Sequence, residues 1–267
     1  MTVGTVILVL LAACLLVFAG IAGYTFIIVS KRPFTTLYEA RTKQDDFIPL
    51  ARIPERMVKL LVELEDKDFY AHHGFFFDEI RSAVKMNYQA KKIVYGGSTI
   101  TQQLAKNLYF RFTHNYLRKA SEALIALLME RKLGKERILE MYANIIYFGN
   151  GVYGISDAVR FYFSKPVSDL TLNQMFMLAC LPAIPTRGNP IQYPEVFERV
   201  RNRRLKYHME NTEPPIILPE EANEIFSHHA DSLDPELRKP DDFTRNYPQD
   251  IPLINERFGP FGSKVDA

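Results

Sequence analysis

The chain has 267 residues, of which 47% are hydrophobic and 24% are charged. This length and composition allow one core of ordinary size plus a tail, which excludes a chain that is disordered throughout. The net charge is only +2 but is uneven, because residues 212–267 hold 12 acidic and 5 basic side chains while residues 1–211 carry a net +9. A basic body suits an anionic lipid, a pyrophosphate or a nucleic acid, so charge alone does not choose the partner.

The first predicted element is a membrane helix. No charged residue occurs from Val6 to Val29, and a helix of this length spans about 36 Å, enough to cross a bilayer. A signal peptide is the alternative, but residues 1–5 lack the basic side chains that usually precede one. We therefore expect residues 1–30 to be a retained single-pass anchor. Lys31 and Arg32 follow it, and the positive-inside bias would keep that flank cytoplasmic.

Residues 31–52 contain two prolines and show little periodicity, which favours a juxtamembrane connector. From Pro54 the apolar spacing is helical and no run of alternating strands occurs, so a mostly α-helical domain is expected over 53–211. Residues 212–267 hold 8 of the 16 prolines and read as an acidic tail with one plausible helix, 219–230. The other expected helices are 54–70, 78–92, 98–110, 116–133, 135–147, 152–163, 171–181 and 195–210.

A glutamate interrupts the apolar face of the helix expected over 54–70, and Asp68 does as well if the helix extends that far. On a helical wheel Glu65 falls in the apolar arc, between Leu61 and Val58, whereas Asp66 falls in the opposite, charged arc. A carboxylate that faces a packed surface loses hydration, so its pKa should rise, and such a base can accept a proton near neutral pH. The alternative is an acid at a helix end that pairs with Lys or Arg.

Two histidines close the same segment. His72 and His73 before Gly74 fit the last turn and cap of a helix better than they fit metal ligation. The sequence contains neither HExxH nor CxxC, so no zinc site is predicted.

A polar helix start follows. Gly96 and Gly97 predict a turn, after which Ser98 can cap a helix whose free N–H groups and positive dipole end could bind an anion. Ser98, Gln102 and Lys106 share one face of this helix, opposite its apolar residues. An ordinary amphipathic helix is the alternative, and the Walker spacing is absent.

Residues 117–129 are apolar over most of the helix circumference, which is typical of a central helix. Arg118 and Glu122 lie one turn apart on it. An exposed pair of this kind contributes only about 0.2–0.5 kcal/mol, too little to offset the cost of burying it. A cleft that opens at this pair explains it better than stability does.

Together these segments resemble the peptidoglycan glycosyltransferase family, glycosyltransferase family 51. Five blocks in the family's order carry the resemblance: EDxxFxxHxG from Glu65 to Gly74, GGSTITQQ with its KN from Gly96 to Asn107, RKxxE from Arg118 to Glu122, KERILEMYAN from Lys135 to Asn144, and LPAIPTRGNP from Leu181 to Pro190 with Arg201 to Arg204 after it.

The resemblance implies an all-α, lysozyme-like catalytic domain beside an N-terminal transmembrane helix. It implies an inverting enzyme that polymerises lipid II into β-1,4 glycan and releases undecaprenyl pyrophosphate. Glu65 would be the general base, and Glu122 would position the donor pyrophosphate. The substrate-binding residues carried over by motif, with His114 added beside them, are Asp66, His72, Ser98, Thr99, Gln102, Lys106, Asn107, His114 and Arg118.

The resemblance also implies the setting of the reaction. A divalent cation, Mg²⁺ or Mn²⁺, would bind transiently with the pyrophosphate. The partners would be lipid II, the growing glycan, the membrane and other proteins of cell-wall synthesis, and not nucleic acid. The anchor would hold the domain on the periplasmic or outer side of the inner membrane.

Two positions depart from the family pattern. His114 stands where many members carry a phosphate-contacting Arg four residues before Arg118, and Ala143 stands where Leu is usual. The SxxK at Ser82–Lys85 lacks the partner motifs of a penicillin-binding transpeptidase, so the chain resembles the monofunctional type.

Two other functions stay open. A hydrolase or lytic transglycosylase on a similar fold also uses paired carboxylates, and a non-catalytic lipid-binding scaffold would tolerate His114. The aligned polar face and the membrane helix favour the polymerase. The acidic tail is expected to dock on the basic body or on a basic partner.

Overall fold

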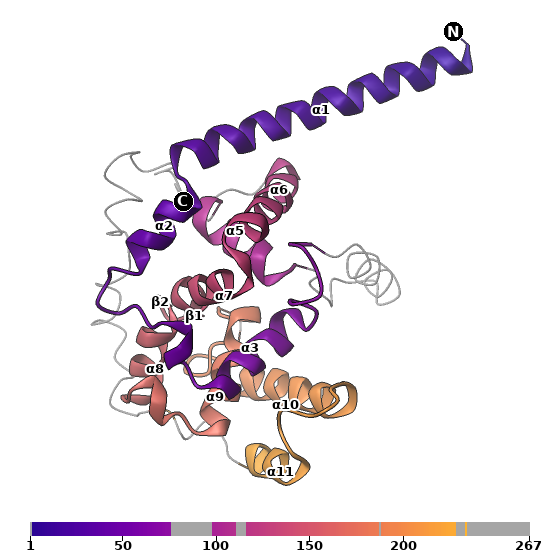
Figure 1. Cartoon of the computed structure of the whole chain (residues 1–267). Helices are drawn as coiled ribbons and strands as arrows, with labels where there is room; N and C mark the ends of the chain where they lie inside the picture. Colours follow the sequence, from indigo (N-terminus) through magenta and orange to yellow (C-terminus); the bar gives the residue numbers. More distant parts are fainter. Residues whose placement is uncertain (1, 76–97, 111–115, 187, 228–232, 234–267) are drawn as a thin grey trace, which may run out of the picture.

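The computed structural model describes residues 2–75, 98–110, 116–186, 188–227 and 233. Its helix α1 (Val3–Lys31) extends away from a helical body, and α2 (Phe34–Arg41) follows it at the edge of that body (Figure 1). α1 is long and apolar enough to cross a membrane, and its most apolar stretch is not buried against the rest of the protein. The helix therefore covers the predicted span from Val6 to Val29.

The body is helical, as the sequence predicts. Its α-helices are α3 (Glu55–Asp66), α5 (Ile100–Tyr109), α6 (Tyr116–Lys132), α7 (Gly134–Ile145), α8 (Ile155–Phe163), α9 (Leu172–Cys180), α10 (Pro194–Asn211) and α11 (Pro219–Ser227). Short 3₁₀ turns, η1 (Leu50–Arg52), η2 (Val167–Asp169) and η3 (Leu181–Ala183), join some of them. The helix expected over 78–92 and the Gly96–Gly97 turn lie outside the described residues.

Helix α5 is the centre of this arrangement. It packs against both α6 and α7, and its apolar residues Ile100, Leu104 and Leu108 are buried. α3 packs on α9 and also contacts α5. The periodic apolar face that predicted these helices is thus the face that forms the core.

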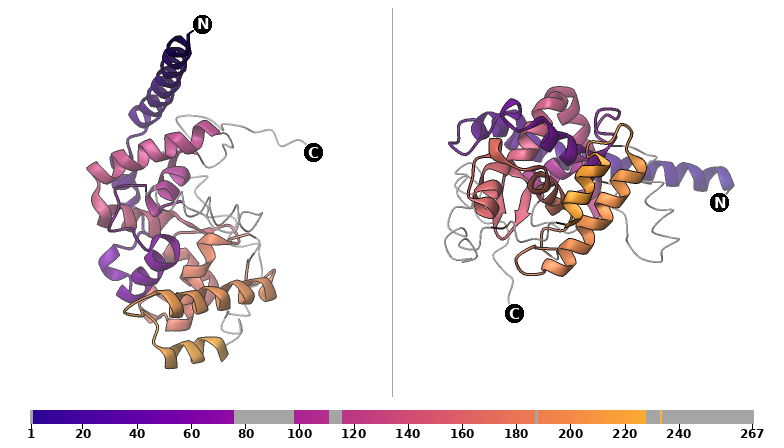
Figure 2. Two further views of the ribbon diagram at one scale, coloured as in Figure 1. Left: turned by 90° about the vertical axis from the view of Figure 1, so that its right-hand side faces the viewer. Right: turned by 90° about the horizontal axis from the view of Figure 1, so that it is seen from below.

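The two ends of the molecule differ. α1 contacts α6, whereas α10 and α11 lie at the opposite end of the body (Figure 2). A membrane crossed by α1 would therefore lie on the α6 side.

A short hairpin replaces the start of the helix that was expected over 152–163. β1 (Tyr147–Gly149) pairs antiparallel with β2 (Val152–Tyr153), and α8 starts at Ile155 instead of at residue 152. The turn between the strands has three consecutive positive φ angles, 90° at Gly149, 55° at Asn150 and 76° at Gly151. Two strands this short leave no alternating pattern to recognise, so the glycines were the available signal.

The segment expected to be a connector packs on the body. The Arg41 guanidinium donates to both oxygens of Asp46 at 2.6 Å and to the Asn144 carbonyl at 3.1 and 3.3 Å. The Asn144 amide also bonds the backbone of Ile48, at 2.8 and 2.9 Å. α2 has only eight residues, too few for its periodicity to stand out in the sequence.

The beginning of the acidic tail also packs on the body. Arg56 donates to the Ile216 carbonyl at 2.9 Å and pairs with Glu221, and Ile217 is fully buried. Residues 212–227 are thus held on the body both by apolar burial and by an ion pair with a basic residue. The rest of the tail, apart from Leu233, lies outside the described residues.

Gly154 provides a stability test. Its φ is +77°, and a Cβ there would lie 2.6 Å from the Asn144 carbonyl oxygen, whereas Gly134, at φ +76°, has open space at the same position. Gly134→Ala should cost about 1–2 kcal/mol of unfolding free energy from backbone strain alone. Gly154→Ala should cost about 3 kcal/mol or more, because the clash adds to the strain. Urea unfolding of both variants in detergent checks this; equal losses would contradict it.

Candidate active site

Three elements hold the carboxylate of Glu65. Its side chain is 5% exposed, and Oε1 accepts from Arg204 Nη1 of α10 at 3.2 Å. Oε2 accepts from Gln103 Nε2 of α5, also at 3.2 Å. Tyr142 of α7 donates its hydroxyl to Gln103 Oε1 at 3.2 Å. The apolar arc of α3 thus places the Glu65 carboxylate among polar side chains of α5 and α10.

Burial raises the pKa of Glu65 above its ordinary 4.5, while the nearby Arg204 and the hydrogen bond from Gln103 partly oppose this rise. The predicted dehydration of Glu65 and the predicted direction of its pKa shift are therefore confirmed. A carboxylate in this setting can act as a base whose affinity for a proton exceeds that of an exposed glutamate.

The helical wheel placed Asp66 on the charged, exposed arc, and this prediction is wrong. It is 4% exposed, and its Oδ2 accepts from the backbone N–H of Ile100 at 2.8 Å. His72 Nε2 lies 3.0 Å from both of its oxygens, and Gly74 N donates to His72 Nδ1 at 3.1 Å. Nε2 therefore carries the hydrogen that Asp66 accepts.

The expectation that His72, His73 and Gly74 form the last turn and cap of a helix is also wrong. α3 ends at Asp66, so His72 is outside its last turn. Gly74 is needed for another reason: its φ is +100°, and a Cβ would lie 3.0 Å from the Ala126 backbone of α6. A close approach of two backbones, and not a helix cap, requires this glycine.

The start of α5 is not a free anion site. Thr99, and not Ser98, is the N-cap, and it forms a capping box with Gln102. The first helical N–H, that of Ile100, is bonded to Asp66. The expectation of free N–H groups here is therefore wrong, because the protein's own carboxylate occupies the positive end of the helix.

Glu122 lies buried between two cations of its own helix. It is 1% exposed, with Oε1 at 2.7 Å from Arg118 Nη1 and Oε2 at 3.3 Å from Lys119 Nζ. Lys119 Nζ also donates to Ser98 Oγ at 2.8 Å, and its side chain is 50% exposed. We call Arg118, Lys119 and Glu122 the α6 charge cluster. In this cluster the carboxylate of Glu122 is buried, whereas the cationic side chains of Arg118 and Lys119 reach toward the surface.

Lys106 and Asn107 lie one turn beyond Gln103 on α5. Lys106 is exposed, and Asn107 donates its side-chain amide to the Gln103 carbonyl at 2.9 Å. Residues three apart are neighbours on a helix surface, so Lys106 lies beside Gln103, the α5 residue that bonds Glu65. α5 thus contacts Glu65 through Gln103 and the α6 charge cluster through Gln102, whose Oε1 accepts from Lys119 Nζ at 3.5 Å. His114 lies outside the described residues.

The predicted site residues therefore fall into two groups. Asp66, His72, Thr99 and Gln102 are buried and bonded within the protein, so this arrangement supports a role in holding α3 and α5 together. Those with exposed or half-buried side chains are Ser98, Lys106, Asn107 and Arg118. Direct substrate contact by either group stays a prediction.

Sequence reasoning missed four residues of the site: Gln103, Lys119, Tyr142 and Arg204. All four fall inside the family-like blocks, which was the available signal. On the helical wheel Ser98, Gln102 and Lys106 formed the polar face, and Gln103 fell between this face and the apolar one. Arg204 lies 139 residues from Glu65 in sequence, so only the fold could pair them.

The described residues do not fit a resident metal ion. Within them no group of three or more His, Cys, Asp and Glu side chains could hold one. Asp66 and Glu122 are already bonded to groups of the protein. Any divalent cation would depend on oxygens supplied by a substrate, so no step is derived through one.

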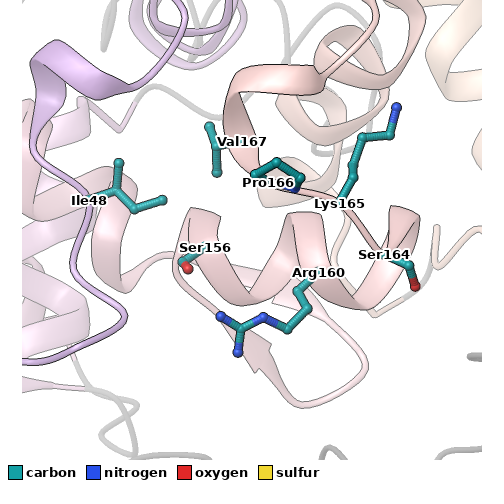
Figure 3. A pocket seen from close by; sticks show the side chains of 7 residues that line it. All are labelled: Ile48, Ser156, Arg160, Ser164, Lys165, Pro166 and Val167. Atoms are coloured by element: carbon teal, nitrogen blue, oxygen red, sulfur yellow. The ribbon is translucent and has the colours of Figure 1, made fainter.

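A cavity of about 400 Å³ lies elsewhere, between the α2–η1 segment and the end of α8 (Figure 3). It is lined by Ile48, Ser156, Arg160, Ser164, Lys165, Pro166 and Val167, none of which is a predicted site residue. Arg160 and Lys165 point in opposite directions in Figure 3, so they do not form an anion cradle.

The model of the transglycosylase family matches residues 31–210. The chain therefore belongs to that family, glycosyltransferase family 51, as its motifs indicated. It is 41% identical to penicillin-binding protein 1A of Aquifex aeolicus over 68% of this chain and 24% of that one. It is 35% identical to penicillin-binding protein 4 of Bacillus subtilis over 79% of this chain and 32% of that one.

The matched region is thus about a quarter to a third of these relatives' length. Among solved structures, penicillin-binding protein 1A of Haemophilus influenzae aligns over 68% of this chain and 17% of its own, with 20% identity and a TM-score of 0.40.

Asp66→Ala should destabilise the body. It leaves the buried Ile100 N–H and His72 Nε2–H without their acceptor, which should cost about 2–5 kcal/mol of unfolding free energy. Glu55→Ala on the same helix removes an exposed acid that pairs with Lys59, and it should leave the unfolding midpoint unchanged. Urea unfolding checks both variants; similar midpoints would contradict a structural role for Asp66.

Proposed function

We propose that this protein is a membrane-anchored peptidoglycan glycosyltransferase that polymerises lipid II into β-1,4 glycan. The observation that carries the proposal is the carboxylate of Glu65, buried, raised in pKa and held by Arg204 and Gln103 in a chain of the transglycosylase family. Such a group is suited to take a proton from a sugar hydroxyl at neutral pH.

In the proposed reaction Glu65 accepts the proton of the acceptor sugar's 4-hydroxyl. That oxygen attacks the anomeric carbon of the growing chain and forms the new glycosidic bond. The bond from the anomeric carbon to the pyrophosphate oxygen breaks, and its electron pair leaves with undecaprenyl pyrophosphate. Attack from the face opposite the leaving group inverts the α configuration to β.

Three cations would stabilise the leaving group, namely the exposed Lys106 and Lys119 and the half-buried Arg118. Arg118 and Lys119 are fixed by the buried Glu122, and Lys106 lies one turn from the Glu65 contact on α5. Preorganised positive charge at a departing pyrophosphate lowers the barrier most effectively where water is excluded. A divalent cation brought with the substrate would add countercharge to the leaving group.

The arrangement favours transfer over hydrolysis by paired carboxylates. A two-carboxylate glycosidase needs its second acid free to protonate a leaving group or to activate water. Glu122 is instead buried between two cations, which suits the support of a phosphate-binding site. The product separates the two functions, because a polymerase lengthens lipid II and a hydrolase shortens preformed glycan.

The setting belongs to the same proposal. α1 anchors the domain in the inner membrane, and the substrate's lipid tail lies in the same bilayer. The domain then works on the periplasmic or outer side, with other cell-wall synthesis proteins as partners.

Glu65→Gln should lower the rate of lipid II polymerisation by about 10²–10⁴-fold, because the amide cannot accept the proton. Glu55→Gln, an exposed acid on the same helix, is the matched control and should keep full activity. Gel analysis of glycan made by the detergent-solubilised protein measures both. Full activity of Glu65→Gln, with its folding verified, would refute the base assignment.

Activity should also fall in acid. Burial raises the pKa of Glu65 above 4.5, and only the charged form accepts a proton. The base is therefore lost as pH falls through the raised pKa, so the acid limb of kcat/KM should lie above pH 4.5. Initial rates between pH 4 and 9 measure this; full activity down to pH 4.5 is the contrary result.

A further inference from the structure

A chain of two hydrogen bonds leads from Tyr142 to the base. The Tyr142 hydroxyl donates to Gln103 Oε1, and Gln103 Nε2 donates to Glu65 Oε2, each at 3.2 Å. Tyr142 is fully buried on α7, and its pKa is raised well above 10, chiefly by burial. The hydroxyl therefore keeps its hydrogen at any physiological pH.

This direction of donation favours the charged form of Glu65. A glutamine amide has one acceptor oxygen and one NH₂ group, so a donor on the oxygen leaves the NH₂ group to face the carboxylate. Two donors in series also polarise one another toward the negative charge. A protonated Glu65 would need an acceptor at the same place. Turning the Gln103 amide would supply one, but it would take from the buried Tyr142 hydroxyl the oxygen to which that hydroxyl donates, which is costly.

The other charged or titratable groups around Glu65 are few among the described residues. Arg204 of α10 pairs with the opposite oxygen, and Asp66 is its neighbour on α3. The Cys180 thiol of α9 is buried, which raises its pKa to about 12, so it stays neutral. Among the described residues Cys180 also reaches Glu65 through a second side chain, because its sulfur interacts with Arg204, whereas Tyr142 reaches it through Gln103.

We propose that Tyr142 is a positioning residue that holds Gln103 as a donor toward Glu65, so that the base returns to its charged form after each proton it accepts. This inference rests on the proposed function. It assigns a role to a buried core tyrosine that would otherwise be read only as packing.

Tyr142→Phe removes the hydroxyl and keeps the ring. Gln103 can then turn its oxygen to a protonated Glu65, which stabilises the acid form. The acid limb of lipid II polymerisation should therefore move by about 0.5–1 pH unit toward higher pH. Activity should fall most at low pH and recover at high pH, which a general loss of folding would not produce.

Tyr162→Phe is the matched control. Tyr162 is also a buried tyrosine, 2% exposed, but its hydroxyl donates to the Phe148 carbonyl at 2.8 Å. Its loss should leave the acid limb in place even if the unfolding midpoint drops. An equal shift in both variants would overturn the proposal.

A double-mutant cycle isolates the route through Gln103. In a Gln103→Leu background, Tyr142→Phe should cause no further shift of the acid limb. An undiminished shift there, or no shift in the wild-type background, overturns the positioning role. Tyr142→Met also lacks the hydroxyl and repeats the test if the phenylalanine variant does not fold.

The same assay separates this inference from the function on which it rests. A wild-type protein that makes no glycan from lipid II refutes the proposed function itself. A wild-type protein that polymerises with an acid limb that Tyr142→Phe leaves in place refutes only the role of Tyr142.

Discussion

The cost of burying the Glu65 carboxylate organises the centre of this protein. A dehydrated carboxylate is tolerated only where charges and donors surround it. Arg204 and Gln103 supply these, one for each oxygen, from helices far apart in sequence. Burial raises the pKa of Glu65, and Arg204 and Gln103 partly oppose this rise. The result is a carboxylate that can carry its charge and still accept a proton. Because α10, α5 and α7 must all meet at this point, the base also constrains how they pack.

Helix α5 joins the two charged centres. In its first turn Ile100 bonds Asp66 and Gln102 accepts from Lys119 of the α6 charge cluster, and the next residue, Gln103, bonds Glu65. Because Asp66 already neutralises the helix end, the proposed binding of pyrophosphate depends on side-chain cations.

The position of the anchor fits this chemistry. α6 carries the charge cluster, and it is a helix that α1 contacts, whereas α10 and α11 lie at the far end (Figures 1 and 2). On the proposed function, the pyrophosphate of a membrane lipid would meet positive charge near the bilayer. Lys31 and Arg32 follow α1 on the flank that the proposal places outside, against the positive-inside bias, so the proposed outer side depends on the chemistry of the substrate.

The sequence alone determined the helical class, the membrane helix, the family-like blocks and the burial of Glu65, because each follows from local order along one helix or one motif. It did not determine that Asp66 turns inward, that Thr99 caps α5 or that Arg204 and Tyr142 act on Glu65. Those contacts join elements that are distant in the chain. Helical periodicity reports which face is apolar, but only packing decides which polar group finds a buried partner, so the partners of the base appeared with the tertiary structure.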